Sequence, residues 1–332
     1  MPADPVSPAA VTGTAAAADG PARGGFDPRV IAAAGAVTIS LTAVLTKLAD
    51  TTAATVVFYR CLLALPPLAL LVYGEVRRHG WPRPRTLAIQ VLGGIFLGLD
   101  FALWTQSIMM IGAGIATIIN NVQVIVVPLL AWAFYRDRIP LRFVLAVPVM
   151  FIGIALAGGL VGQAPPETTD PVLGTLLGLA SGVAYAGYIV VVGRTGSHLR
   201  ANSQVFVSTV AAGVSGTALG LVWGSIDLNP GWGAIGWLAL LALSAQVIGW
   251  VLLGASLPRL PAQVGAALLL LQPALALFFA MLLVDENPTG WQLAGSAVVI
   301  AAVWFVSRTP RRARPPATDT DTLPPQDAAA TP

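Results

Sequence analysis

The amino-acid sequence predicts an all-α integral membrane protein whose ten transmembrane helices form two inverted five-helix repeats. Composition is the first observation: 56% of the 332 residues are hydrophobic and only 10% are charged, whereas soluble domains carry about 25% charged residues. The second observation is a succession of apolar runs, each near the length that crosses a bilayer. The third is an internal repeat, in which Gln123 aligns with Gln272.

The apolar runs set the predicted number of helices. A spanning helix needs about 20 mostly apolar residues, and it satisfies its own backbone hydrogen bonds, which lipid cannot do. No run alternates in the manner of a barrel strand. The ten predicted helices are 31–46, 53–73, 87–109, 113–135, 142–160, 173–192, 203–223, 234–256, 262–284 and 291–307.

The basic residues predict the orientation, because Lys and Arg gather in cytoplasmic loops. With ten helices both ends of the chain lie on one side, and that side holds all of the 18 Lys and Arg residues except Lys47 and Arg60. We therefore expect a multi-pass protein of the plasma (inner) membrane with cytoplasmic N- and C-termini. Both tails are expected to be disordered. The first, 1–29, is rich in Ala, Pro and Gly, and the second, 308–332, is basic and then rich in Pro, Thr and Asp.

The internal repeat has an offset of 149 residues. In each copy a Gln within an apolar helix is followed 14 residues later by an acidic residue and a turn. The first copy has Gln123 and Asp137, and the second has Gln272 and Glu286. The copies keep their element lengths although they match weakly residue by residue.

Each predicted repeat, 30–162 and 171–307, contains five helices. Because five is an odd number, the second repeat enters the membrane in the opposite orientation to the first. Inverted repeats of this kind are typical of secondary transporters, whose substrate site lies near the bilayer midplane between the halves. The chain contains no GxxxxGK[ST] motif for ATP hydrolysis, so ion or solute gradients would drive transport.

Three segments resemble a known family. LLLLQPALALFFAMLLVDENPTGWQLAGSAVVIAAV (268–303) has a Pro within a helix, an acidic residue after it and then a helix that contains Gly. FYRCLLALPPLALLV (58–72) has an Arg near its start, and ATIINNVQVIVVPLLAWAFYRDRIP (116–140) repeats the first pattern. Over about residues 30–307 the sequence resembles the EamA-type, ten-helix branch of the drug/metabolite transporter (DMT) superfamily.

The resemblance implies the fold and the general activity of that family, whose members move amino acids, other metabolites and drugs. One departure concerns the fourth predicted helix. Val124 stands where the family pattern has Pro, and Pro128 follows four residues later. A hinge at the family's Pro position is therefore not implied for this helix.

Asp100 is the most informative single residue. It lies inside the third predicted helix, which carries no basic residue around it. A carboxylate in hydrocarbon costs at least about 2.5–3.5 kcal/mol, so Asp100 must be protonated, paired or open to a water-filled cavity. A residue of the substrate pathway that also carries a coupling proton is one interpretation, and a structural hydrogen bond to a neighbouring helix is the other.

Residues near Asp100 suggest a cavity. Trp104 and Ser107 follow it at helical spacing and share its face. Asn121, on the next and antiparallel helix, is expected at a similar depth, where it would hydrogen-bond Asp100 or a substrate amine. The alternative for Asn121 is a bond that only holds helices together.

The second half supplies further candidates for the substrate pathway. Gln246 and Trp250 lie one helical turn apart in the eighth predicted helix, Gln272 lies within the ninth, and Tyr185 lies deep in the sixth. Pockets combine aromatic walls with a few polar groups, and these residues supply that mixture. The alternative for each of them is packing.

Two further patterns concern the helix ends and the helix contacts. Lys47 and Arg60 are expected to reach lipid headgroups, or else to form an external gate or a salt bridge to Asp50. Glycines spaced by four, as in Gly94–Gly98 and Gly174–Gly178–Gly182, are expected to bring helices close within one bundle rather than to form a dimer.

The function classes can then be compared. No HExxH or GxSxG motif suggests an enzyme, and one Cys with two His residues gives no reason to expect a metal or any other cofactor. We expect a small-molecule substrate and the lipid bilayer as partners, no nucleic acid, and a monomer or homodimer. The sequence predicts a secondary transporter that exports amino-acid-like or drug-like metabolites by alternating access around a central cavity. A channel or a non-transporting membrane scaffold is the alternative.

Overall fold

The computed structural model describes residues 27–136, 141–161, 165, 168–193, 201–256, 260, 268–269 and 271–307. Every regular element in these residues is helical. The predicted tails lie outside the described residues apart from 27–29, and so does Asp137, the acidic residue of the first repeat copy.

The helices of the described residues divide between the two halves of the chain. In the first half they are α1 (Pro28–Ser40), α2 (Thr42–Leu48), α3 (Ala53–His79), α4 (Pro84–Ile111), α5 (Ala113–Asn120), α6 (Gln123–Tyr135) and α7 (Leu141–Ala157). In the second half they are α8 (Pro171–Val192), α9 (Ala201–Gly220), α10 (Gly231–Leu241), the π-helical η2 (Ala242–Gly249), α11 (Trp250–Ser256), α13 (Leu271–Leu283) and α14 (Gly290–Ser307).

Membrane-spanning helices are confirmed. Within the described residues, six helical stretches are long and apolar enough to cross a bilayer: Pro28–Leu48, Ala53–His79, Pro84–Ile111, Ala113–Phe134, Pro171–Val192 and Gly231–Leu253. Each coincides with a predicted span. The helices α7, α13 and α14 are apolar but shorter, and the 20-residue α9 lies over the predicted span 203–223. The total of ten spans stays a prediction.

Two predicted spans contain an interruption. The span 113–135 is divided at Asn121 and Val122, whose N–H groups bond to carbonyls three residues back instead of four. The span 234–256 contains the π-helical segment η2, a rare geometry that is frequent at functional sites. The first interruption follows Asn120, which is partly buried, and the second contains the buried Gln246.

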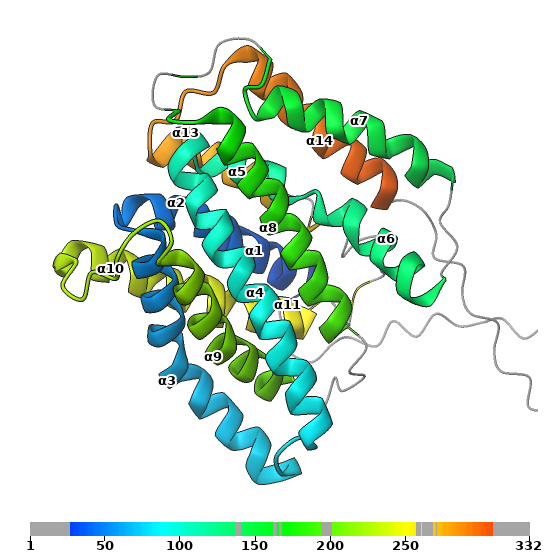
Figure 1. The fold of residues 1–332 in the computed structure, drawn as a ribbon. Coiled ribbons are helices and arrows are strands. Elements are labelled where there is room, and N and C mark those ends of the chain that lie inside the picture. The colour runs from blue at the N-terminus through cyan, green and yellow to red at the C-terminus, as the bar shows by residue number, and fades with distance from the viewer. Residues whose placement is uncertain are drawn as a thin grey trace, which may run out of the picture.

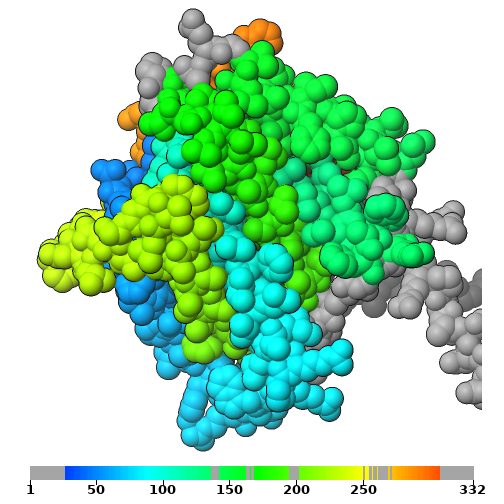
Figure 2. All heavy atoms as spheres, viewed as in Figure 1, coloured from blue at the N-terminus to red at the C-terminus, as the bar shows by residue number. Residues whose placement is uncertain are grey.

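Helix α4 lies between α8 and α9 (Figure 1), and it packs against both of them. Glycines permit these approaches: a Cβ on Gly98 of α4 would overlap the backbone of Gly216 on α9, and a Cβ on Gly182 of α8 would overlap the carbonyl oxygen of Asn120. The glycine stripes therefore pack helices within the bundle, as the sequence predicts. In the space-filling view, the atoms of α4, α8 and α9 meet on the face that is shown (Figure 2).

The outer surface of the bundle is apolar. Leu70, Phe134 and Val214 are each at least 70% exposed, and many other large apolar side chains share this surface. Soluble monomers rarely expose contiguous apolar patches of this extent, whereas such side chains suit hydrocarbon. Several polar side chains are buried instead, among them Arg60, Asp100 and Gln246.

Candidate functional site

A buried cluster of polar side chains surrounds Asp100. Asp100 lies on α4, about 16 Å from the helix end at Ile111 at 1.5 Å per residue, and only 7% of it is exposed. Its Oδ1 accepts a hydrogen bond of 2.9 Å from Asn120 Nδ2, which also donates to Ser181 Oγ. Since Ser181 belongs to α8, this contact joins the first half of the chain to the second.

The structure places Asn120, rather than the predicted Asn121, beside Asp100. The Nδ2 of Asn121 donates to the carbonyl oxygen of Thr117 on its own helix, at 2.8 Å. Neighbouring helical residues point about 100° apart, so only one of the two asparagines can face α4. The predicted hydrogen bond from Asn121 to Asp100 is therefore wrong, and a bond from Asn121 to a substrate amine stays a prediction.

The face of α4 that carries Asp100 is buried over its length. Trp104 is 8% exposed and packs within the largest apolar cluster of the described residues. Ser107 is fully buried and donates to the carbonyl oxygen of Gly174 on α8 at 2.8 Å. These three side chains share one buried face, as their spacing predicts.

Arg60 and Gln246 form a second polar contact between the halves. Arg60 Nη2 lies 3.4 Å from Gln246 Oε1, and Gln246 Nε2 donates to Thr209 Oγ1 at 3.1 Å. Only 4% of Arg60 is exposed, and the ring of Phe101 lies 3.7 Å from its guanidinium carbon. The prediction that Arg60 reaches headgroups or pairs with Asp50 is therefore wrong, because its side chain points into the protein.

The remaining predicted site residues differ in their surroundings. Tyr185 is partly buried, stacks on Tyr188 with 5.9 Å between ring centroids, and lies within electrostatic range of Asp100. The side chain of Gln272, at the start of α13, is partly buried and makes no hydrogen bond within the described part of the chain. The side chain of Trp250 lies outside the described residues.

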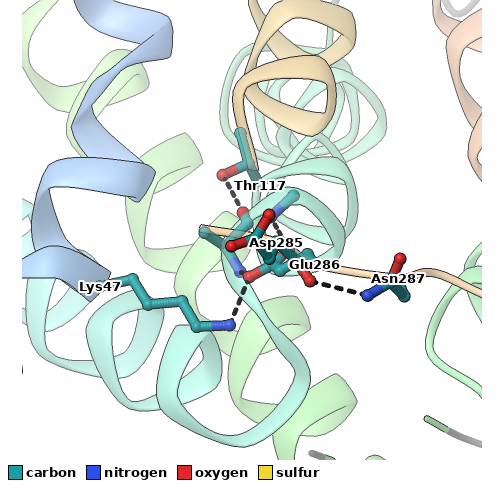
Figure 3. A network of polar contacts seen from close by, with 7 residues as sticks. Lys47, Thr117, Asp285, Glu286 and Asn287 are labelled. Carbon is teal, nitrogen blue, oxygen red and sulfur yellow. Dashed lines mark hydrogen bonds and ion pairs between the residues drawn. The ribbon is translucent and has the colours of Figure 1, made fainter. Parts of the chain in front are cut away.

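A third contact between the halves is centred on Glu286 (Figure 3). Its Oε1 accepts hydrogen bonds from Lys47 Nζ at 2.8 Å and from the N–H of Ala113 at 2.5 Å, and its Oε2 accepts one from the N–H of Gly114 at 3.1 Å. Both N–H groups open α5, where the helix dipole attracts an anion. Lys47 thus pairs with Glu286, and both oxygens of this buried carboxylate have partners.

Backbone geometry aims Glu286 at α5. Asp285 adopts a left-handed φ of 52°, which Asp tolerates better than most residues, and the N–H of Glu286 bonds to the carbonyl oxygen of Ala280. On the other side of the contact, Gly112 has a φ of 92°. A Cβ on Gly112 would lie 2.9 Å from the carboxylate of Glu286, so the contact requires glycine there.

A second carboxylate caps another helix of the bundle in a similar way. Glu75, near the end of α3, accepts hydrogen bonds from the N–H groups of Asn202 at 2.9 Å and Ser203 at 3.0 Å, which open α9. The hydroxyl of Ser203 adds a third bond of 2.6 Å. Figure 1 places the end of α3 opposite the end of the bundle where α2, α5 and α13 meet. At each end, one half therefore caps a helix of the other half.

Several of these contacts are not evident from the sequence. Asn120 and Ser181 were not selected, although Ser181 lies among the glycines of α8 that bring helices close. Glu75 is a carboxyl group among basic residues, which gave no reason to expect a cap. Arg60 lies inside an apolar run, and this position indicates a buried side chain. Its short distance from the end of the run was the weaker indication.

The chemistry of the central cluster is hydrogen bonding and ionisation. Within the part of the chain that the structure describes, no group of three or more His, Cys, Asp or Glu residues is placed to hold a metal ion. Amide and hydroxyl groups from both halves instead surround one carboxyl group and one guanidinium group. Such an arrangement can bind a polar solute and can carry a proton.

Comparison with known proteins gives the family. Residues 29–159 and residues 172–308 each match the model of the EamA-like transporter family. The chain belongs to the EamA-like transporter family. Over 252 residues it is 27% identical to an uncharacterized transporter of Synechocystis sp., an alignment that covers 74% of this chain and 76% of that protein. The EamA-like chain is thus a multi-pass membrane transporter.

The fold also resembles that of a protein of known crystal structure. The TM-score is 0.56 at 14% sequence identity, and the match covers 86% of this chain and 98% of the other. At this identity the similarity concerns the fold alone.

Proposed function

We propose that this EamA-like protein is a secondary transporter that exports small, amino-acid-like or drug-like metabolites by alternating access. In this mechanism the five-helix halves, 30–162 and 171–307, lie inverted in the plasma membrane, and both termini are cytoplasmic. The halves rock about a central site and expose it to one side of the membrane at a time.

The observation that carries the proposal is that the buried polar contacts connect the two halves. Asn120 of the first half meets Ser181 of the second, and Arg60 meets Gln246. Hydrogen bonds across such an interface can exchange partners when the halves move, and a solute between them can take up the released groups. Pockets combine aromatic walls with a few polar groups. We therefore propose that the substrate pathway also includes Trp104, Tyr185, Trp250 and Gln272.

The carboxylate caps support closure at alternate ends. With the termini cytoplasmic, Glu286 closes the outer end of the bundle and Glu75 the inner end. Each cap consists of hydrogen bonds between halves. Opening toward one side would require that only the cap on that side be broken, while the other keeps the halves together.

Asp100 is proposed to couple transport to protons. It is an intramembrane carboxyl group, which by default suggests a functional site, and its partner Asn120 can donate to it in either protonation state. In an exporter driven by the proton gradient, Asp100 would take up a proton from the outside and release it to the cytoplasm as substrate leaves.

Flux measurements in proteoliposomes test this proposal. Amino acids and amphiphilic drug-like compounds would be screened for movement driven by a pH gradient, and we expect Asp100→Asn to abolish the dependence on that gradient. Asp227→Asn, at an exposed loop residue, is the matched control and should leave transport unchanged. Unaltered pH dependence in Asp100→Asn would exclude the proton-coupling role.

The other parts of the proposal have separate tests. A substrate whose transport is lost in both Asp100→Asn and Trp104→Phe would support the central site. Unitary currents without saturable solute flux would favour the channel alternative. Labelling of tags that places the two termini on opposite sides of the membrane would contradict the inverted arrangement.

A further inference from the structure

The guanidinium of Arg60 is buried without the partners that a buried charge normally has. Two of its three nitrogens, Nε and Nη1, are fully enclosed and have no hydrogen-bond partner within the described part of the chain. The third, Nη2, makes a single long contact of 3.4 Å with Gln246. A buried polar group that lacks partners is rare in proteins and calls for an explanation.

A structural ion pair does not supply that explanation. Among the described residues the one salt bridge within 4 Å joins Lys47 to Glu286. Asp100 lies within electrostatic range of Arg60, but its Oδ1 accepts its hydrogen bond from Asn120. Arg60 therefore holds a positive charge inside the bundle with most of its hydrogen-bonding capacity unused.

Phe101 limits where an anion can bind to the guanidinium of Arg60. The Phe101 ring covers a face of the guanidinium at 3.7 Å, which leaves the edges for hydrogen bonds. A two-pronged bond to a carboxylate uses Nη2 together with either Nε or Nη1. Both of the unpartnered nitrogens can thus take part in such a bond.

Gln246 holds the guanidinium in this position. Its Nε2 donates to Thr209 Oγ1 at 3.1 Å, so its Oε1 is the atom that faces Arg60. Gln246 belongs to the π-helical segment η2 of the second half, whereas Arg60 belongs to α3 of the first. Movement between the halves would therefore change the surroundings of Arg60 directly.

We propose that Arg60 is the anion-binding group of the substrate site and that it takes a carboxylate group of the transported molecule, with Gln246 as a positioning residue. This inference rests on the proposed transport function and narrows its substrate class to small carboxylates, including zwitterions. A neutral or purely cationic analogue of the same shape leaves the guanidinium without its partner and binds more weakly.

Binding to the purified full-length protein tests the assignment without requiring transport. The probes are matched compounds that share one side chain: leucine, 4-methylpentanoate, 4-methylpentanamide and isopentylamine, with the corresponding phenylalanine-sized set. Dissociation constants are obtained from ligand-dependent thermal stabilisation. We expect both carboxylate-bearing compounds of a set to bind about 10- to 100-fold more tightly than the amide, the ratio that hydrogen bonds to a charged group supply.

Variants assign this preference to Arg60. Arg60→Met should remove the preference for carboxylate, and Arg60→Lys should retain only part of it, because an ammonium group lacks the two-pronged geometry. Arg77→Met is the matched control, since Arg77 is an exposed arginine of the same helix, and it should keep the full preference. Arg60→Lys keeps the test valid if the methionine variant does not fold.

The outcomes distinguish this inference from the proposed function. Equal binding of acid and amide, a preference that survives in Arg60→Met, or no carboxylate binding up to tens of millimolar would each overturn the role of Arg60. None of these results would contradict alternating access, which is judged by flux. Carboxylate binding that depends on Arg60 in a protein without saturable flux would retain the site and reject the transporter.

Discussion

The contacts at Glu286 and at Arg60 both cross between the halves, but they differ in how completely their charges are satisfied. Glu286 receives hydrogen bonds from Lys47 and from two backbone N–H groups of α5. Arg60 has a single long contact and two unpartnered nitrogens. A satisfied buried charge stabilises the conformation in which it is found, whereas an unsatisfied one destabilises it until a ligand arrives. The first is suited to closing the bundle and the second to binding.

Removing the carboxylate at the outer contact should have the largest effect on stability. Glu286→Ala leaves two N–H groups at the start of α5 and the Lys47 ammonium without their acceptor, and we expect a loss of about 3 kcal/mol. The measurement is the thermal unfolding of the purified protein. Asp50→Asn, at an exposed residue next to the same contact, is the control. Equal unfolding temperatures for the two variants would show that Glu286 does not hold the halves together.

A side chain added beside the Glu286 carboxylate should destabilise the protein less than the loss of that carboxylate. A second glycine substitution separates this crowding from backbone strain. Gly112→Ala forces an unfavourable φ and places a Cβ 2.9 Å from the Glu286 carboxylate. Gly80→Ala forces a comparable φ with nothing within 4 Å of the new Cβ. We expect about 1–3 kcal/mol of destabilisation for Gly112→Ala and less for Gly80→Ala. If the two variants have equal unfolding temperatures, the backbone at Gly112 does not confine the Glu286 carboxylate.

At the contact between Arg60 and Gln246, we expect a substitution to stabilise the protein rather than to destabilise it. Arg60→Met removes a charge that lacks partners, so the ligand-free protein should become more stable by about 1 kcal/mol. The unfolding temperature of the ligand-free protein, compared with that of Arg77→Met, measures this change. A marked loss of stability in Arg60→Met would show that Arg60 has a structural role, and the comparison with Glu286 would fail.

The smallest effect is expected at the cation of the outer contact. Lys47 is 32% exposed, so solvent screens its attraction to Glu286, and Lys47→Met should destabilise by about 0.5–1 kcal/mol. The backbone N–H groups still bind the carboxylate in this variant. The difference from wild type should shrink at high salt, and a loss as large as that of Glu286→Ala would show that Lys47 carries the contact.

Composition and the lengths of the apolar runs were sufficient to predict a multi-spanning helical membrane protein, because the bilayer imposes both constraints on any sequence. The spacing along α4 also predicted the buried face of Asp100, Trp104 and Ser107, since helical periodicity alone decides which residues share a face. The glycine spacing predicted close packing within the bundle for the same reason.

Contacts between helices were decided by the tertiary structure. Whether Asn120 or Asn121 meets Asp100 depends on a rotation of about 100° about the helix axis. Whether Arg60 turns outward to headgroups or inward to Gln246 depends on which helices cover it. Sequence periodicity fixes the faces of a single helix, but the relative rotation and depth of two helices follow from the packing of all of their neighbours.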